Sequence, residues 1–312
     1  MFLLRSLPVL LFCGALLLVY GLEAWLLLGA LLRHERRRLL RARPALALHL
    51  VALAGLGCMA YGFFIEPYRL TLTRLEIATP KLEQARLRIV HFSDTHCDPT
   101  PRLEERLTRR VNALDPDLVV FTGDALNHSG ALARFQETLA GMKASLAKLA
   151  VYGNFDYHHP LRERLLRGTG FRLVDGRPLR LTYGEETIQV TGLSRYPRGG
   201  GEIEGALAGL AEGTFTLFLF HYPDLIEDVP PGRVDLYLCG HTHGGQVRLP
   251  GYGALITLSR HGKKYEAGLY RVGSMRAYVN RGIGMEGGAA PRVRFLAPPE
   301  ITVIDLVPAR GR

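Results

Sequence analysis

The sequence predicts an α/β fold, a layered domain of sheets and helices that follows two membrane-spanning helices. Two long apolar windows lie near the amino terminus, and alternating strand and helix patterns begin at Leu87. Most of the second half shows strand patterns joined by turns that contain glycine, which favours antiparallel pairs and two stacked sheets. With 312 residues, of which 47% are apolar, the chain is long enough to bury a large core.

The two apolar windows cover residues 7–32 and 44–65. Glu23 is the one acidic or basic residue in the first window, and the second has no Asp, Glu, Lys or Arg. Both reach the length of about 20 residues that a helix needs to cross a bilayer. A signal peptide followed by a core helix, or a buried helical hairpin, would give similar windows, but the first is long for a signal peptide and lacks a convincing cleavage site. We therefore expect residues 1–66 to form a two-span anchor in membrane lipid.

The segment between the windows, residues 33–43, sets the expected orientation of the anchor. It carries six arginines and one glutamate, and such a block in a short loop tends to stay in the cytoplasm. We therefore expect a multi-pass protein of the inner or plasma membrane with its large domain outside the cytoplasm. Basic residues at positions 69, 74, 81, 86 and 88 favour the opposite orientation, although three nearby glutamates weaken that signal.

The net charge of +10 belongs mostly to the membrane end of the chain. Residues 1–88 carry 12 Lys or Arg against 5 Asp or Glu, whereas residues 89–312 carry 27 against 24. Arginines beside a membrane set topology and meet anionic lipid. The large domain shows no basic stripe of the kind that binds a duplex, so no nucleic-acid partner is expected.

The elements beyond the second window start with an expected linker over residues 67–86. The domain is expected over residues 87–307, with a tail over 308–312. Its first half alternates, with expected strands at residues 87–94, 117–124 and 148–156 and expected helices at 102–114 and 131–146. Later strands are expected within residues 171–194, 214–221, 234–241, 277–284 and 300–307. Such an alternation places helices on the outside of sheets.

Polar residues stand at the ends of five of these expected strands. In chain order they are Asp94 and His96, Asp124, Asn154 and Asp156, His221, and His241 and His243. The carboxyl ends of strands in α/β sheets border the ligand crevice. Any one of these residues has an ordinary explanation as a helix cap, a turn or a core side chain. Five such motifs, each closing an apolar strand, predict one shared site.

Cysteines give no disulfide framework in this chain. Cys97 and Cys239 each stand beside a histidine motif, in DTHC and CGHTH. They could bind metal or pair oxidatively, but neither belongs to a CxxC motif, and small buried residues are the commoner explanation.

The strand-end motifs resemble those of the calcineurin-like metallophosphoesterase family, whose pattern is DxH, GD, GN, a single His and GHxH. The resemblance covers about residues 87–307. Two further stretches, GHTHGGQVRLPGYGA at residues 240–254 and YVNRGIG at residues 278–284, are similar to a membrane-associated branch of bacterial phosphodiesterase-type proteins. That branch also resembles transmembrane metallophosphoesterases and one class of UDP-2,3-diacylglucosamine pyrophosphatase.

This resemblance implies a four-layer sandwich, with two mixed sheets flanked by helices, and a centre of two divalent metal ions. It implies that one metal is held by Asp94, His96 and His243, the other by Asn154, His221 and His241, and both by Asp124. Imidazole together with oxygen donors suits Mn, Fe or Zn better than Ca.

The implied activity is hydrolysis of a phosphodiester or pyrophosphate bond by a metal-bridged hydroxide. Because the expected anchor would hold the site near lipid, we expect a lipid-linked phosphate substrate. The candidate is UDP-2,3-diacylglucosamine, in lipid A biosynthesis. The alternatives are a nuclease or general phosphodiesterase, and a non-catalytic membrane protein that retains the metal fold.

One position departs from the family pattern. Much of the family has a histidine after the Asn, where this chain has Phe155, whose ring cannot donate a proton to a leaving group. Either His158 or His159 replaces it, or the leaving group is acidic enough to need no donor, as in a pyrophosphate, or the enzyme is slow or inactive.

Overall fold

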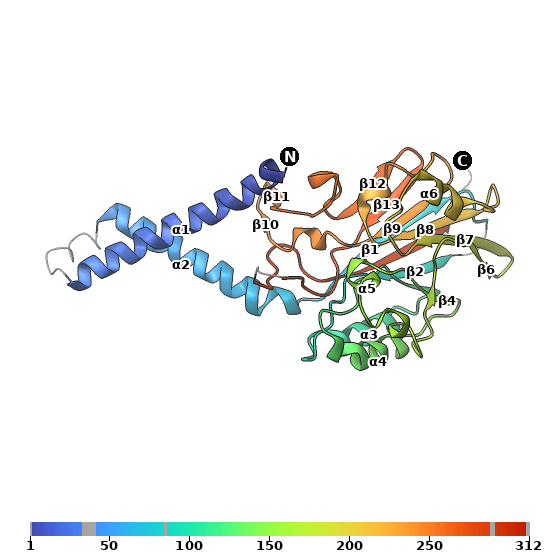
Figure 1. The fold of residues 1–312 in the computed structure, drawn as a ribbon, viewed down its shortest axis with the longest axis horizontal. Helices are drawn as coiled ribbons and strands as arrows, with labels where there is room; N and C mark the ends of the chain where they lie inside the picture. The colour runs from blue at the N-terminus through green and yellow to red at the C-terminus, as the bar shows by residue number, and fades with distance from the viewer. Residues whose placement is uncertain (1, 33–41, 84–85, 288–290, 310–312) are drawn as a thin grey trace. The chain divides into compact units, whose positions relative to one another are not determined.

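The computed structural model describes residues 2–32, 42–83, 86–287 and 291–309 (Figure 1). They divide into two compact units, residues 1–66 and residues 67–312. The first unit consists of the helices α1 (Phe2–Leu32) and α2 (Arg43–Phe64). The arginine block at residues 33–41, on which the expected orientation depends, lies outside the described residues.

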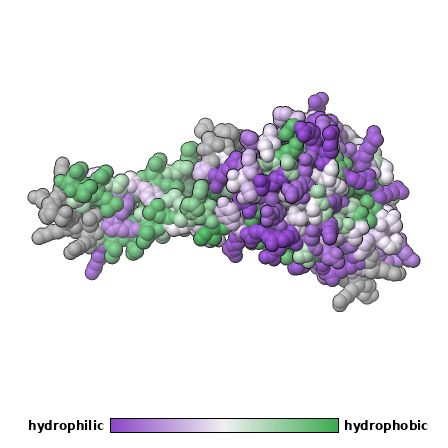
Figure 2. All heavy atoms as spheres, turned by 90° about the horizontal axis from the view of Figure 1, so that it is seen from below, coloured by the Kyte–Doolittle hydropathy of each residue, from purple (hydrophilic) through white to green (hydrophobic). Residues whose placement is uncertain are grey.

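The helices α1 and α2 carry apolar side chains around their surface. Two spans, Leu7–Leu32 and Arg43–Tyr68, are long and apolar enough to cross a membrane. Hydrophobic residues cover most of the helical part of the chain in Figure 2, and side chains such as Leu17 and Leu53 are largely exposed. A polar contact joins the helices, since His49 Nδ1 lies 2.7 Å from Glu23 Oε1. Helices of a soluble core would bury these leucines.

The expected linker at residues 67–86 contains a strand, which corrects that prediction. Strand β1 (Thr71–Thr79) pairs in parallel with β14 (Glu300–Pro308) over nine residues, from Thr71 opposite Glu300 to Thr79 opposite Pro308. Strand β1 mixes polar and apolar residues without strict alternation, and each of its first six side chains is at least partly exposed. Its pairing partner lies at the other end of the chain, so local sequence patterns gave no sign of it.

The first sheet has six strands in the order β1-β14-β2-β3-β4-β5. Strand β14 runs antiparallel to β2, and the strands from β2 to β5 are parallel. The helices α3 (Glu104–Asn112) and α4 (Leu132–Ala140) follow β2 and β3. The strands of this parallel group are β2 (Leu87–Phe92), β3 (Leu118–Phe121), β4 (Ala147–Ala150) and β5 (Arg172–Leu173).

The second sheet also has six strands, in the order β12-β13-β9-β8-β7-β6. Its four central strands are parallel, and only the edge pairs β6–β7 and β12–β13 are antiparallel. The expectation of mostly antiparallel pairs in the second half is therefore wrong, because helix α6 (Gly200–Leu207) and several loops act as crossovers between parallel strands. The strands are β6 (Leu179–Tyr183), β7 (Glu186–Leu193), β8 (Phe215–Phe220), β9 (Leu236–Cys239), β12 (Gly268–Val272) and β13 (Met275–Val279).

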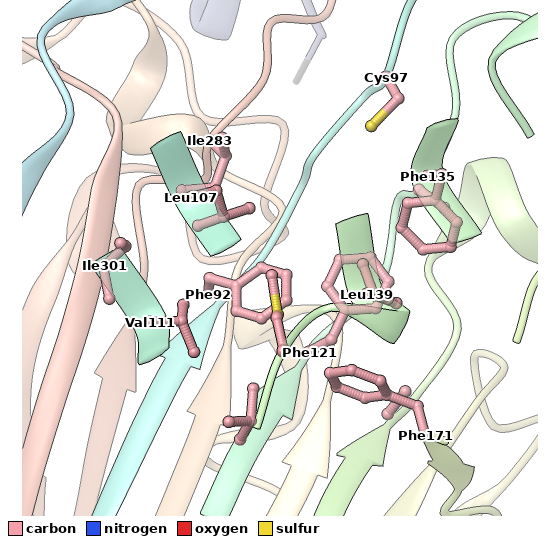
Figure 3. Packing of buried hydrophobic residues seen from close by; sticks show 14 of the residues in the cluster. Phe92, Cys97, Leu107, Val111, Phe121, Phe135, Leu139, Phe171, Ile283 and Ile301 are labelled. Atoms are coloured by element: carbon pink, nitrogen blue, oxygen red, sulfur yellow. The ribbon is translucent and has the colours of Figure 1, made fainter. Parts of the chain in front are cut away.

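Three buried clusters hold the layers together. Phe92 and Phe121 stack at 5.3 Å between the first sheet and the helices α3 and α4, as Figure 3 shows. A second cluster joins the two sheets, with Ile89 and Leu217 among its members. The third packs α6 against the second sheet around Phe218. The order of helix, sheet, sheet and helix confirms the expected four-layer α/β sandwich.

Candidate metal centre

The strand-end residues of both sheets meet at one edge of the sandwich. Loops after β2, β3 and β4 contribute from the first sheet, and loops after β8 and β9 from the second. Backbone bonds tie neighbouring loops together, since Asp94 N donates to Gly123 O at 2.8 Å and His96 N donates to Asp124 O at 3.0 Å. His241 N donates to Asp94 Oδ2 at 3.1 Å, which joins the two sheets.

Six of the seven expected ligands fall into two groups. In each group the ligand atoms lie within 4.8 Å of one another; the groups are Asp94, His96 and His243, and Asp124, His221 and His241. The seventh, Asn154, is next to Phe155, whose backbone nitrogen donates to Asp124 Oδ1 at 2.9 Å. The structure thus brings together all the strand ends on which these ligands were expected.

Asp124 lies between the two groups. Its Oδ2 atom is 3.2 Å from His221 Nε2 and 3.7 Å from His96 Nε2, so one carboxylate oxygen faces a histidine of each group. In the first group, Asp94 Oδ1 lies 3.4 Å from His243 Nε2. Such separations between donor atoms leave room for a cation that several of them share.

Four buried donor atoms at this edge make no hydrogen bond with any described residue. They are Nε2 of His96, His221 and His243, and Oδ1 of Asn154. A buried polar atom without a hydrogen bond costs about 1 to 3 kcal/mol, so four such atoms on neighbouring loops call for a bound group. Nitrogen and oxygen donors of this kind fit divalent cations.

The other ring nitrogen of two of these histidines is fixed by an acceptor. His96 Nδ1 lies 2.9 Å from Asn127 Oδ1, and His221 Nδ1 lies 2.7 Å from Thr122 O. Both contacts favour the tautomer with its proton on Nδ1, which leaves the lone pair of Nε2 directed to the centre. The residues therefore fit two divalent metal ions.

The backbone at the ligands is unusual, because five of them have positive φ angles. These are Asp94 (51°), His96 (40°), Asp124 (61°), His241 (70°) and His243 (52°). Residues other than glycine avoid this region, at a cost of order 1 to 3 kcal/mol each.

Neighbouring glycines make the tight loops possible. A Cβ atom on Gly240 would lie 2.1 Å from Asp94 Oδ2, and one on Gly153 would lie 2.1 Å from Asp124 Oδ1.

Asp156 has a role that sequence reasoning missed. Its carboxylate is fully buried and accepts hydrogen bonds from the backbone nitrogens of Asp124 (2.7 Å), Ala125 (2.7 Å) and Gly153 (3.0 Å). It therefore fastens the loop after β3 to the loop after β4. The available signal was its place two residues after Asn154, at the end of a strand motif.

Arg294 is a second residue that the sequence did not reveal. Its guanidinium is fully buried and donates to the carbonyl oxygens of Gly284 (2.9 Å) and Ala297 (2.8 Å). One of its nitrogens lies 3.3 Å from His243 Nδ1. Arg294 thus supports a loop behind a candidate ligand, and no local pattern indicated this contact.

Burial and charge shift the pKa values of the ligands in opposite directions. Burial lowers the pKa of His96 to about 4 and that of His241 to about 3, so both are neutral near pH 7. Burial also acts on His221, but the carboxylates of Asp124 and Asp94 outweigh it and raise the pKa to about 10. Without metal, His221 therefore carries a proton that a cation must displace.

The two thiols near the site behave as buried side chains. Cys97 and Cys239 are both free, and burial raises the pKa of each thiol well above its usual range. A raised pKa disfavours the thiolate that binds metal.

Phe155, which stands where much of the family has a histidine, and the two nearby histidines, His158 and His159, have different surroundings. The Phe155 ring meets the His96 ring edge-on, with centroids 4.8 Å apart, so position 155 borders the centre. His159 uses both ring nitrogens locally, accepting from Leu161 N at 3.1 Å and lying 3.4 Å from Ser129 Oγ. His158 is exposed and lines a pocket together with Asn154.

A four-layer α/β sandwich with two clusters of nitrogen and oxygen donors at its strand ends defines a metal-dependent phosphoester hydrolase. The family model described as calcineurin-like phosphoesterase matches residues 87–245. The chain belongs to this family. Its centre takes two divalent metal ions.

Several relatives are similar to this chain over most of their length. The uncharacterized metallophosphoesterase YkuE of Bacillus subtilis is 35% identical over 267 residues, which cover 82% of this chain and 92% of that protein. The phosphodiesterase YaeI of Escherichia coli is 28% identical over 88% of this chain and 99% of its own. The UDP-2,3-diacylglucosamine pyrophosphatase LpxG of Chlamydia muridarum is 26% identical over 77% of this chain and 90% of its own length.

Proposed function

We propose that this protein is a membrane-anchored hydrolase that cleaves a phosphodiester or pyrophosphate bond in a lipid-linked substrate. The observation that carries the proposal is the set of four buried donor atoms without a hydrogen bond, which come from loops of both sheets. Three of them, the histidine Nε2 atoms, lie within 3.7 Å of a carboxylate oxygen of Asp94 or Asp124. They lie in a chain that also has two helices apolar enough to cross a membrane. An anchor of this kind would hold the centre close to a lipid headgroup.

We assign one cation to Asp94, His96 and His243, the other to Asn154, His221 and His241, and both to Asp124. The position of Asp124 Oδ2 between His96 Nε2 and His221 Nε2 supports its shared role. Mn, Fe and Zn all suit this donor set. When bound, the two cations supply a nucleophile from water near neutral pH and neutralise charge on the phosphate.

The protein's own residues position this chemistry. Asn127 and Thr122 keep the ring protons of His96 and His221 on Nδ1, and Asp156 holds the two loops that carry Asp124 and Asn154. The Phe155 ring packs edge-on against the His96 ring and offers no proton. The leaving group is then either protonated by His158 from the neighbouring pocket or acidic enough to leave as an anion, as a phosphate does.

The substrate assignment draws on the relatives and on the anchor. LpxG is named as a UDP-2,3-diacylglucosamine pyrophosphatase, and it matches 77% of this chain. A lipid-linked pyrophosphate of that class would need no proton donor at position 155, and we take it as the candidate, in lipid A biosynthesis. We place the enzyme in the inner or plasma membrane, with its catalytic domain outside the cytoplasm, as the arginine block at residues 33–43 predicts. UDP-2,3-diacylglucosamine is a cytoplasmic metabolite, so this particular substrate would require the opposite orientation, and an outward domain would act on another lipid-linked phosphate.

The test is turnover of bis-p-nitrophenyl phosphate by the full chain in detergent. We expect activity with added Mn²⁺, loss of activity with a chelator, and none in Asp124→Ala. The absence of any metal-dependent turnover would favour a non-catalytic protein. A panel of UDP-2,3-diacylglucosamine, a phosphodiester lipid and DNA then separates the classes, and preference for DNA would refute the lipid-linked substrate.

A further inference from the structure

A pocket opens beside the candidate centre, between the loop after β4 and the loop after β7. Asn154, Tyr157 and His158 line it from the first loop, and Arg195 and Arg198 line it from the second. Because Asn154 also carries one of the unpartnered donor atoms, the pocket adjoins the place where a phosphate would react. A group attached to that phosphate would extend into it.

The charge of the pocket suits an anion. None of its lining residues is acidic. Glu202 lies 2.9 Å from Arg195 and offsets part of one positive charge. Arg198 is exposed and makes no hydrogen bond or ion pair with any residue that the structure describes. A guanidinium in this state is free to bind two phosphate oxygens at once.

The pocket also has aromatic walls. Three tyrosines line it, namely Tyr157, Tyr196 and Tyr222. The Tyr222 ring lies 4.5 Å from the ring of His241, and Tyr196 meets Tyr222 edge-on at 5.4 Å. A run of rings therefore leads from the candidate ligand His241 into the pocket, where Tyr196 is 42% exposed. Exposed tyrosines beside arginines bind flat rings by stacking.

We propose that this pocket binds the nucleoside monophosphate part of a phosphoanhydride substrate, with Arg198 and Arg195 on its phosphate and Tyr196 against its base. This inference rests on the proposed function and narrows its substrate class. Hydrolysis breaks one P–O bond of the anhydride and adds the oxygen of water to phosphorus. The products are a nucleoside monophosphate and the phosphate monoester of the other group, and each leaves as an anion. No proton donor is then needed at Phe155.

The test compares small probes as inhibitors of bis-p-nitrophenyl phosphate hydrolysis by the Mn²⁺-loaded full chain. We expect UMP to inhibit about 10-fold more strongly than ribose 5-phosphate or uridine, because it alone offers both the phosphate and a stacking ring. Equal inhibition by UMP and ribose 5-phosphate would overturn the aromatic part of the proposal. Inhibition by uridine as strong as that by UMP would overturn the arginine part.

Variants separate the two parts of the pocket. Arg198→Gln is expected to weaken inhibition by UMP and by ribose 5-phosphate alike, by about 10-fold, since both compounds lose a charged contact. Tyr196→Leu is expected to weaken inhibition by UMP and to leave inhibition by ribose 5-phosphate unchanged. Arg180→Gln, an exposed arginine on β6, is the matched control and should change neither inhibition constant. A uniform loss in both pocket variants, accompanied by lower metal content, would show structural damage and refute these roles.

Calorimetric titration of UMP into the same proteins separates this inference from the proposed function. Binding of UMP that depends on Arg198 and Tyr196, in a chain without turnover, would support the pocket and refute the hydrolase. Turnover without such binding would support the hydrolase and refute the pocket.

Discussion

The carboxylate of Asp156 accepts a hydrogen bond of 2.7 Å from the backbone nitrogen of Asp124. It accepts two more, from Ala125 and Gly153, so a single buried side chain spans two loops of the candidate centre. Asp124 has a φ of 61°, a conformation that needs support from its surroundings. Asp156 supplies part of that support without being an expected ligand.

Replacing Asp156 should therefore damage both stability and metal binding. We expect Asp156→Ala to lower the free energy of unfolding by about 3 kcal/mol, because three buried N–H groups lose their acceptor. Denaturant unfolding and metal analysis of the purified chain measure the two effects. Asp175→Ala is the control, since its exposed carboxylate accepts from the single nitrogen of Ser194. Equal losses in both variants would contradict the role of Asp156.

Loss of Asp124 should empty both metal positions. Its Oδ2 atom faces His96 and His221, one from each group, whereas His243 lies close to Asp94 of its own group. We expect Asp124→Ala to retain less than one metal per chain and His243→Ala to retain about one, by elemental analysis after dialysis. Two metals and full turnover in Asp124→Ala would rule out a shared ligand.

A histidine at position 155 should help poor leaving groups most. The Phe155 ring is 4.8 Å from the His96 ring, so Phe155→His would place an imidazole at the edge of the centre. A general acid raises the reaction rate by about 100 to 10,000-fold when the leaving group is poor, and by much less when the leaving group is good. We expect kcat/KM to rise for alkyl phosphodiesters and to change little for nitrophenyl esters and pyrophosphates.

His158→Ala in the same background is the companion measurement. If His158 is the resident donor, this variant should lose activity on alkyl substrates, and Phe155→His should restore it. Equal gains from Phe155→His on alkyl and aryl substrates would contradict an anhydride-adapted site.

Metal binding should release a proton from His221. Its pKa is raised to about 10 by Asp124 and Asp94, above the ordinary value of 6.5. The ion pair it forms therefore stabilises the metal-free protein below about pH 6.5, and this contribution is lost as the pH rises through 10. At pH 8 we expect Mn²⁺ to displace about one proton per chain from this ring.

Calorimetric titrations in two buffers with different ionisation enthalpies would count that proton. His221→Ala should remove it. Binding without a difference between the buffers would mean that His221 is neutral before metal arrives.

The orientation of the proposed membrane anchor can be tested directly. The arginine block at residues 33–43 predicts a cytoplasmic loop and an outward domain. Alkaline phosphatase fused to the carboxyl terminus should then be active, and a fluorescent reporter that folds only in the cytoplasm should stay dark. The reverse result would place the domain on the side where nucleotide-linked lipid precursors are made and would strengthen the nucleoside phosphate pocket.

The strand ends of the candidate centre could be predicted because each closes a short apolar run with a distinctive motif. Asp94, Asp124 and His221 lie within three residues of the end of such a run, and parallel strands bring their carboxyl ends to one edge. The same local patterns predicted the helices at α3 and α4.

Features that depend on distant pairing could not be predicted in this way. Strand β1 is specified by its contact with β14, more than 200 residues later, and the parallel centre of the second sheet depends on which strands become neighbours. The contact of Arg294 with His243 joins two loops, and the three hydrogen bonds of Asp156 form only after two strands align. A single sequence shows these side chains but not their partners.

The left-handed backbone conformation of five candidate ligands lowers the stability of the fold while it positions the metal-binding side chains. Glycine adopts that conformation at little cost, so replacing Asp94, His96 or His243 by glycine would relieve local strain, although the donor atoms would be lost. Glycine at these positions would therefore exchange a metal-binding side chain for a more relaxed backbone. The five positive φ angles thus mark the residues at which this chain carries backbone strain together with metal-binding side chains, the combination expected where a site is built for chemistry.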